Sequence, residues 1–137
     1  MIDTDRVRVT TVIRTDPDTA FQVFTGEIDA WWKRDPQHRP HGGAVRFDSG
    51  RLLEGDSEVA RVVAWEPGTR LLLEWLTWEF RPGERTEVEV LFEGVGDGTR
   101  VTVEHRGWER RPKGAEVFRT VVGLWWGALL PGYARQR

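Results

Sequence analysis

The spacing of apolar residues along the chain changes period, and each period predicts a different element. Residues 6–13 (RVRVTTVI) alternate, with Val7, Val9 and Thr11 on one face and polar residues on the other. This pattern is typical of a half-buried strand. A short helical region follows, then a long stretch of period two from residue 43, and finally one long stretch of helical period after residue 112.

Two short helices are predicted directly after the first strand. Asp16 is placed to cap the first helix, and Pro17 stands at its first position, where a missing N–H costs nothing. Gly26 is expected to end this helix. In EIDAWW, residues 27–32, Ile28, Trp31 and Trp32 are spaced three and four apart and predict a second helical turn.

The middle of the chain reads as a series of strands joined by tight turns. The predicted strands cover residues 44–48, 51–55, 57–65, 70–80, 86–93 and 100–108. The stretch GVGDGT, residues 94–99, superficially resembles a nucleotide-binding loop, but a strand follows it rather than a helix. We therefore expect a hairpin turn at Asp97-Gly98.

The last element is a long helix, expected over residues 113–130. A broad apolar arc runs along it, formed by Val117, Phe118, Val121, Val122, Leu124, Trp125, Ala128 and Leu129. Trp125 lies near the middle of this arc and Trp126 on its flank. Pro131 and Gly132 are expected to stop or kink the helix.

Together these elements predict an α+β protein with a helix-grip fold. A curved antiparallel sheet would wrap around the long C-terminal helix, with the two short helices after the first strand. Residues 1–137 are expected to form one domain, since a chain of this length is the size of one ordinary domain.

Composition narrows the classes of function. The formal net charge is −2 with 31% charged residues, which argues against a general nucleic-acid binder. The chain has no cysteine, so disulfides and thiolate metal sites are excluded. No stretch approaches a membrane span and the start lacks the apolar core of a signal peptide, so a cytoplasmic protein is expected. Eight tryptophans form a large aromatic load, which can fill a core or line a cavity.

The chain resembles the SRPBCC (START-like) superfamily, and within it the branch named for activators of a heat-shock chaperone's ATPase, the AHSA type. The resemblance rests on TDPDTAFQVFTGEIDAWW, AWEPGTRLLLEW, GDGTRVTVEHRGW and GLWWGALL, taken in this order, and it covers essentially the whole chain. It departs at Pro131, where relatives usually continue the helix, and in the polar loop from Lys33 to Pro40. It implies a helix-grip domain with an internal cavity for a small, largely apolar or amphipathic molecule.

The same resemblance assigns roles to the paired tryptophans. Trp31 would close the end of the sheet's concave side, and Trp32 would be a partly exposed residue at the cavity or its rim. Trp125 would face the cavity from the long helix. The residues that we expect to contact a ligand are Trp32, Phe47, Trp75, Phe92, His105, Trp108 and Trp125.

His105 is the polar residue of greatest chemical interest. Alternation places it on the same strand face as Val101 and Val103, so it points inward. There it could transfer a proton, bind a ligand carbonyl, or serve as a structural histidine with satisfied hydrogen bonds. Without a defensible triad or a nucleophilic cysteine, His105 is the catalytic candidate only if the protein is an enzyme.

Two further polar groups have both a functional and a structural interpretation. His38 and His41, in HRPH, have a spacing seen in zinc sites, but a third ligand is missing. We therefore expect these histidines to lie solvated in a loop, and we expect the protein to bind no metal or other cofactor. The basic edge formed by Arg106, Arg110, Arg111 and Lys113 could attract an anionic headgroup, although a solvated turn fits it better.

Three functions therefore remain open from the sequence. The leading one is a non-catalytic or regulatory module that binds a small apolar ligand. The second is a cavity enzyme of the cyclase, dehydratase or hydrolase type that uses His105. The third is a protein-interaction module, such as a chaperone partner.

Overall fold

The computed structural model describes residues 6–76, 86–107 and 115–137. Within these ranges the elements follow the order that the sequence predicts, which is a strand, two short helices, six strands and a long helix. They are β1 (Arg6–Ile13), α1 (Pro17–Gly26), α2 (Ile28–Trp31), β2 (Val45–Asp48), β3 (Arg51–Glu54), β4 (Ser57–Glu66), β5 (Arg70–Trp75), β6 (Thr86–Val95), β7 (Gly98–Arg106) and α3 (Ala115–Ala134).

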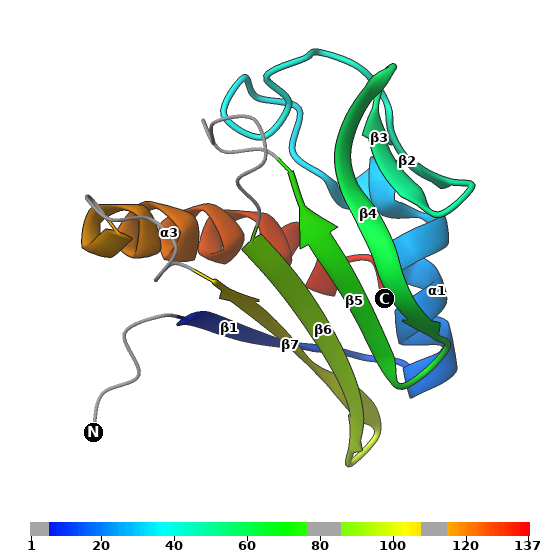
Figure 1. Cartoon of the computed structure of the whole chain (residues 1–137). Coiled ribbons are helices and arrows are strands. Elements are labelled where there is room, and N and C mark those ends of the chain that lie inside the picture. Colours follow the sequence, from blue (N-terminus) through cyan, green and yellow to red (C-terminus); the bar gives the residue numbers. More distant parts are fainter. Residues whose placement is uncertain (1–5, 77–85, 108–114) are drawn as a thin grey trace.

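The seven strands of the described residues form one antiparallel sheet in the order β1-β7-β6-β5-β4-β3-β2. From β2 to β7, each strand pairs with the strand that follows it in the sequence. The first strand instead pairs with the last, β7, from Arg6 opposite Arg106 to Ile13 opposite Thr99. All three helices lie on the same side of the sheet (Figure 1). The predicted helix-grip fold is confirmed.

Local sequence signals place the first helix and the late hairpin as expected. The side chain of Asp16 accepts a hydrogen bond from the backbone N–H of Thr19, as an N-cap does, and Pro17 is the first helical residue. The two-residue loop between β6 and β7 is Gly96-Asp97, one residue earlier than the predicted turn, and Gly96 has a φ of 56°. Glycine adopts this left-handed conformation without a steric penalty.

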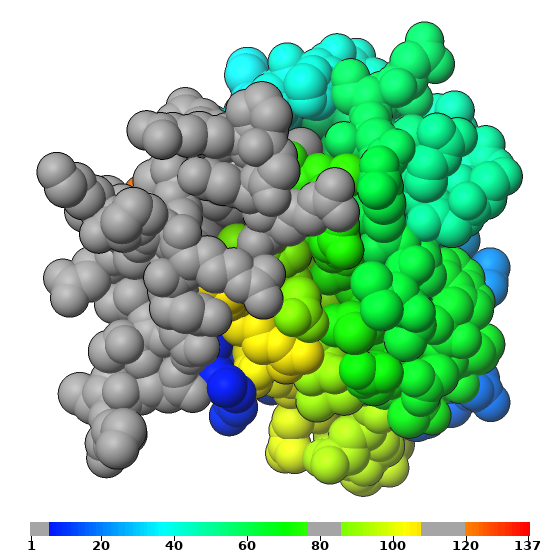
Figure 2. Space-filling model, in the orientation of Figure 1, coloured from blue at the N-terminus to red at the C-terminus, as the bar shows by residue number. Residues whose placement is uncertain are grey.

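The outer face of the sheet is polar and held by ion pairs (Figure 2 shows this face). Glu104 on β7 bonds Arg6 and Arg8 on β1, each at 2.9 Å, and Arg106 at 3.2 Å. Burial opposes ionisation of Glu104, but hydrogen bonds from Arg8 and Arg106 outweigh it and lower its pKa. Arg106 also pairs with Glu87 and Glu89, so it belongs to this network. Arg110, Arg111 and Lys113 of the predicted basic edge lie outside the described residues.

The long helix differs from its prediction at the C-terminal end. It does not stop at Pro131 but continues to Ala134, although a proline inside a helix removes one hydrogen bond. The reason is the packing of Tyr133, which is fully buried. Its hydroxyl donates to the backbone carbonyl of Ala20 at 2.7 Å, and its ring meets Phe24 edge-on at 5.3 Å. These tertiary contacts hold the last turn in helical form.

The buried stripe of this helix is rotated around the helix axis relative to the predicted arc, because Val121, Leu124 and Ala128 are exposed whereas Trp126, Leu130 and Tyr133 are buried. From residue 120 onward it consists of Val122, Trp125, Trp126, Leu129, Leu130 and Tyr133, whereas the side chains of Val117 and Phe118 lie outside the description. Trp126 lies at its centre and is 1% exposed, while Trp125 lies at its margin with 9%, which reverses the predicted roles. Val121 and Leu124 were expected on the buried side, but they are 47% and 71% exposed because they project from the side of the helix away from this stripe. No helix of the described residues is long and apolar enough to cross a bilayer.

Candidate functional site

Four indole rings meet between the sheet and α3. Trp75 ends β5, Trp32 follows α2, and Trp125 and Trp126 come from α3. The ring of Trp32 stacks on Trp75 with 6.5 Å between centroids, and it meets Trp125 and Trp126 edge-on at 5.3 and 6.0 Å. We call these four residues the indole cluster. It lies on the concave side of the sheet, at the end of β5.

Burial of Trp32 corrects the prediction of a partly exposed rim residue. Only 4% of Trp32 is exposed. Its neighbours in the cluster cover the ring, and its indole N–H donates to the backbone carbonyl of His38 at 2.9 Å. Trp31 is buried as expected, with its N–H bonded to the carbonyl of Val23 at 3.0 Å and its ring tilted against Phe24.

The indole N–H groups of the cluster have different partners. The group on Trp125 donates to the carbonyl of Gln37 at 3.0 Å, and that on Trp126 donates to Nδ1 of His105 at 3.3 Å. The N–H of Trp75 is buried and has no hydrogen-bond partner among the described residues. A buried donor without a partner costs about 1–3 kcal/mol, so most such groups in native proteins are paired. Trp75 therefore carries an unused hydrogen-bond donor inside an aromatic cluster.

His105 adjoins the cluster and is fully buried, as its inward phase predicts. Since Nδ1 accepts from Trp126, the neutral ring carries its proton on Nε2, which donates to Oγ1 of Thr86 at 2.7 Å. The ring of Trp75 lies edge-on at 5.8 Å. Burial lowers the pKa of His105 to about 3, so the imidazole is neutral at physiological pH. Both ring nitrogens are engaged in the fold.

The loop between α2 and β2 is organised by a buried arginine rather than being a solvated segment. Arg39 is 5% exposed, and its guanidinium bonds the carboxylate of Asp29 at 2.6 Å. Its remaining N–H groups donate to the backbone carbonyls of Asp29, Trp32, Lys33 and Gly43. A hydrogen bond from the backbone N–H of Val45, together with Arg39, lowers the pKa of Asp29 against the effect of its partial burial. Arg39 thus holds this loop in one conformation.

His38 fastens the same loop to α3, which corrects the expectation of a solvated histidine. It is 4% exposed, and its ring stacks on the indole of Trp125 with 4.6 Å between centroids. Its Nδ1 bonds the carboxylate of Asp35 at 2.9 Å, and Nε2 bonds the backbone carbonyl of Trp125 at 3.1 Å. His41 remains exposed.

The other predicted ligand contacts lie apart from the cluster. Phe92 packs against Phe21 and Phe24 at 5.2 and 5.9 Å, in the core beneath α1. Phe47, on β2, is partly buried and meets Trp65 edge-on at 5.4 Å. Trp108 lies outside the described residues. Within the described residues no group of three or more histidine, aspartate or glutamate side chains is arranged to hold a metal ion.

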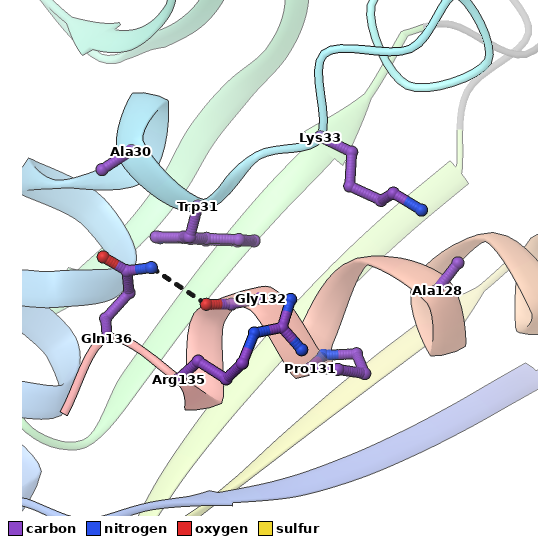
Figure 3. A pocket seen from close by; sticks show the side chains of 8 residues that line it. All are labelled: Ala30, Trp31, Lys33, Ala128, Pro131, Gly132, Arg135 and Gln136. Atoms are coloured by element: carbon purple, nitrogen blue, oxygen red, sulfur yellow. Dashed lines mark hydrogen bonds between the residues drawn. The ribbon is translucent and has the colours of Figure 1, made fainter.

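Two hollows are lined by described residues. One, of about 380 Å³, lies between α2 and α3, where Trp31 faces Gly132, with Arg135 beside Gly132 and Lys33 beyond Trp31 (Figure 3). The other is a groove of about 740 Å³ between the two short helices and strands β2 and β4, and it contains Phe47 and Trp65. Neither is lined by Trp75 or His105.

The sequence interpretation overlooked Trp65 and Arg39, and it placed Trp126 on the flank of the buried stripe rather than at its centre. A signal for Trp65 exists, since the run Val62-Val63-Ala64-Trp65 contains four apolar residues in succession and breaks the alternation of a regular strand. Trp126 was placed on the flank because the predicted arc included the side of the helix that carries Val121, Leu124 and Ala128, which is exposed. Arg39 has no local signal, because its partners are backbone carbonyls that only the folded loop brings together.

This arrangement of sheet and helices defines a member of the helix-grip class. The family model described as activator of Hsp90 ATPase homolog 1-like protein matches residues 14–130. The chain belongs to this AHSA1 family, within the SRPBCC superfamily. No curated protein gives a significant match.

Solved structures with low sequence identity share the fold. CalC from Micromonospora echinospora, described as a self-sacrificing resistance protein, is 22% identical with a TM-score of 0.74, over 98% of this chain and 95% of that one. The Aha1 dimer from Colwellia psychrerythraea is 15% identical with a TM-score of 0.68, over 98% and 94%. An HSP90 activator from Plasmodium falciparum, PFC0360w, is 18% identical with a TM-score of 0.54, over 74% and 72%. At these identities the likeness concerns the fold alone.

Proposed function

We propose that this protein is a non-catalytic or regulatory module that binds a small, largely apolar molecule carrying a hydrogen-bond acceptor. The site is the interior of the helix grip around Trp75, with Trp32, Trp125 and His105 beside it. The ligand would lie against the indole rings and would accept a hydrogen bond from Trp75.

The observation that carries this proposal is the unpartnered indole N–H of Trp75. The residue is 1% exposed, so bulk water does not solvate its donor. A phenylalanine in its place would provide an aromatic ring without the cost of a buried polar group. Small-molecule sites usually combine apolar and aromatic walls with a few placed polar groups, and Trp75 supplies one such group.

The enzyme alternative is less well supported, because it requires proton transfer by His105. A general acid or base needs a nitrogen that can reach the substrate and a pKa near the working pH. In this protein Nδ1 and Nε2 already bond Trp126 and Thr86, and burial lowers the pKa to about 3. These properties fit a histidine that positions Trp126 and Thr86 better than one that transfers protons.

The third possible function is that of a chaperone partner, and one structural neighbour, PFC0360w from Plasmodium falciparum, is an HSP90 activator. In the present chain such a role would use an exposed surface rather than the interior. It makes a different prediction from the proposal, because substitution of the buried Trp75 would leave partner binding unchanged.

Native mass spectrometry of protein purified from its natural source tests the proposal. The wild type should carry a co-purifying small molecule, and the Trp75→Phe variant should carry much less of it while keeping its circular dichroism spectrum. Trp31→Phe is the matched control, since the N–H of Trp31 bonds the carbonyl of Val23 within the protein. Equal occupancy in wild type and Trp75→Phe, or no bound molecule in either, would contradict the assignment.

A further inference from the structure

The groove between the short helices and the edge of the sheet is a separate feature from the indole cluster. It has a volume of about 740 Å³. In Figure 1, α1 lies behind β4, with β2 and β3 above it. Its walls come from the second half of α1, from α2 and from β2 and β4, and its two large aromatic residues are Phe47 and Trp65. The volume is within the range of sites that bind small molecules.

A β-bulge turns Trp65 toward this groove. On β4, Val62 pairs with Leu73 and Ala64 pairs with Leu72, so Val63 is an extra residue without a partner on β5. Before the bulge Ala60 and Val62 point to the concave side, and after it Trp65 does, opposite Leu71. If the strand alternated strictly from Val62 onward, with no bulge, Trp65 would instead point to the outer face. Bulges commonly redirect a side chain next to a functional site.

The redirected indole is only partly used by the core. Trp65 meets Phe21 edge-on at 5.2 Å and Phe47 edge-on at 5.4 Å. Even so, 45% of Trp65 remains exposed, although it lies on the side of the sheet that holds the core. An aromatic ring held by two others and open on its remaining surface can accept a further flat ring.

The acidic residues of the groove are already compensated by arginines. The carboxylate of Glu27 pairs with Arg137 at 2.8 Å. The carboxylate of Asp29 pairs with Arg39 at 2.6 Å and with Arg34 at 3.3 Å, so two positive side chains lie beside one negative one. This part of the groove therefore has an excess of one positive charge.

Arg46 adds a second positive charge. It lines the groove from β2 and donates to the backbone carbonyl of Gly55 at 2.9 Å, but it has no carboxylate partner in the described part of the chain. The groove thus combines exposed aromatic surface with an excess of cationic groups. Both properties complement a flat aromatic molecule with a negative charge.

We propose that this groove is a second binding site, for a small planar aromatic anion such as an aromatic carboxylate. The ring of the ligand would pack against Trp65 and Phe47, and its anionic group would be attracted by Arg46 and Arg34. This site is independent of the interior site around Trp75, so either assignment can fail without the other.

Titration with 2-naphthoate, observed by the indole ¹H–¹⁵N resonances, tests this second site. Each tryptophan gives one such resonance, and single Trp→Phe variants assign those of Trp65 and Trp75. We expect 2-naphthoate to shift the Trp65 resonance in a saturable manner while the Trp75 resonance stays in place. The neutral analogue 2-naphthamide has nearly the same shape but lacks the negative charge that the arginines attract. Its affinity should therefore be lower by about threefold or more.

Two variants and their controls identify the residues responsible. Trp65→Ala should weaken 2-naphthoate binding by about tenfold, because it removes the aromatic contact. Arg46→Gln should remove most of the preference for 2-naphthoate over 2-naphthamide. Leu124→Ala, at an exposed apolar position on α3, and Arg100→Gln, at an exposed cation on β7, should leave both affinities unchanged.

Three results would overturn the proposal. The first is the absence of a shift of the Trp65 resonance with millimolar 2-naphthoate. The second is equal loss of affinity in Trp65→Ala and Leu124→Ala. The third is movement of the Trp65 resonance with protein concentration alone, which would identify the groove as a contact between copies of the chain.

Discussion

The indole N–H of Trp126 donates to Nδ1 of His105, and this bond determines which nitrogen of the buried imidazole carries the proton. It also connects the long helix to β7, near the point where Thr86 of β6 accepts from Nε2. His105 therefore joins three elements while remaining neutral. This role has consequences for stability that solution measurements can reveal.

Acidification should destabilise the protein through His105. Its pKa is about 3 in the folded state and about 6.5 in the unfolded chain, so the unfolded state binds the proton first as the pH falls. Well above pH 6.5 the unfolded chain does not bind this proton, so His105 does not reduce the free energy of unfolding. Between pH 7 and pH 5 we expect protonation of His105 in the unfolded chain to lower that free energy by about 2 kcal/mol. Urea unfolding at pH 7, 6 and 5 measures this free energy.

Other groups titrate in the same range, so the comparison must be made with a variant. His105→Gln should be less stable at pH 7, but its free energy of unfolding should fall less steeply with acidification. Parallel pH dependences for the two proteins would show that His105 does not carry the effect.

Replacement of Arg39 by lysine should loosen the loop between α2 and β2. Lysine keeps the charge but cannot supply the planar set of donors that reaches four backbone carbonyls and Asp29. We expect a loss of at least about 2 kcal/mol in the free energy of unfolding. Arg34→Lys is the matched control, because Arg34 contacts the same Asp29 from an exposed position. Equal effects of both substitutions would contradict the role of Arg39.

How far the sequence determines the structure differs between the sheet and the loop. Alternation and turn residues are local signals, so the strands and the inward phase of His105 were predictable. The burial of Trp32 was not, because it depends on the loop that Arg39 folds back over the cluster. Trp65 was missed for a related reason, since a single bulged residue reverses the direction of every side chain after it.

The paired tryptophans provide a direct test of the corrected burial. From the sequence alone, Trp32→Ala should cost little stability, whereas the structure places Trp32 and Trp125 in the same cluster, 5.3 Å apart. Both Trp32→Ala and Trp125→Ala should therefore cost about 3–5 kcal/mol. Chemical denaturation measures the free energy of unfolding of both variants. A small loss for Trp32→Ala alone would support the original prediction that Trp32 is a partly exposed rim residue.

Pro131→Ala should stabilise the protein. Alanine restores the missing backbone donor inside α3 and has a higher helix propensity. A gain of about 1–3 kcal/mol is expected, reduced somewhat by the greater freedom of the unfolded chain. Thermal unfolding should show a higher midpoint. A lower midpoint would mean that Pro131 itself is needed to seat Tyr133.

The central claim, that the N–H of Trp75 is a ligand donor, is tested most directly by a pair of probes with nearly the same shape. Fluorenone has a carbonyl acceptor and fluorene has none, so their difference isolates the hydrogen bond. In wild-type protein, fluorenone should bind more tightly and move the Trp75 indole proton downfield, as hydrogen bonding does. In Trp75→Phe the two probes should bind equally. Equal binding to the wild type, with the Trp75 resonance unmoved, would contradict the account.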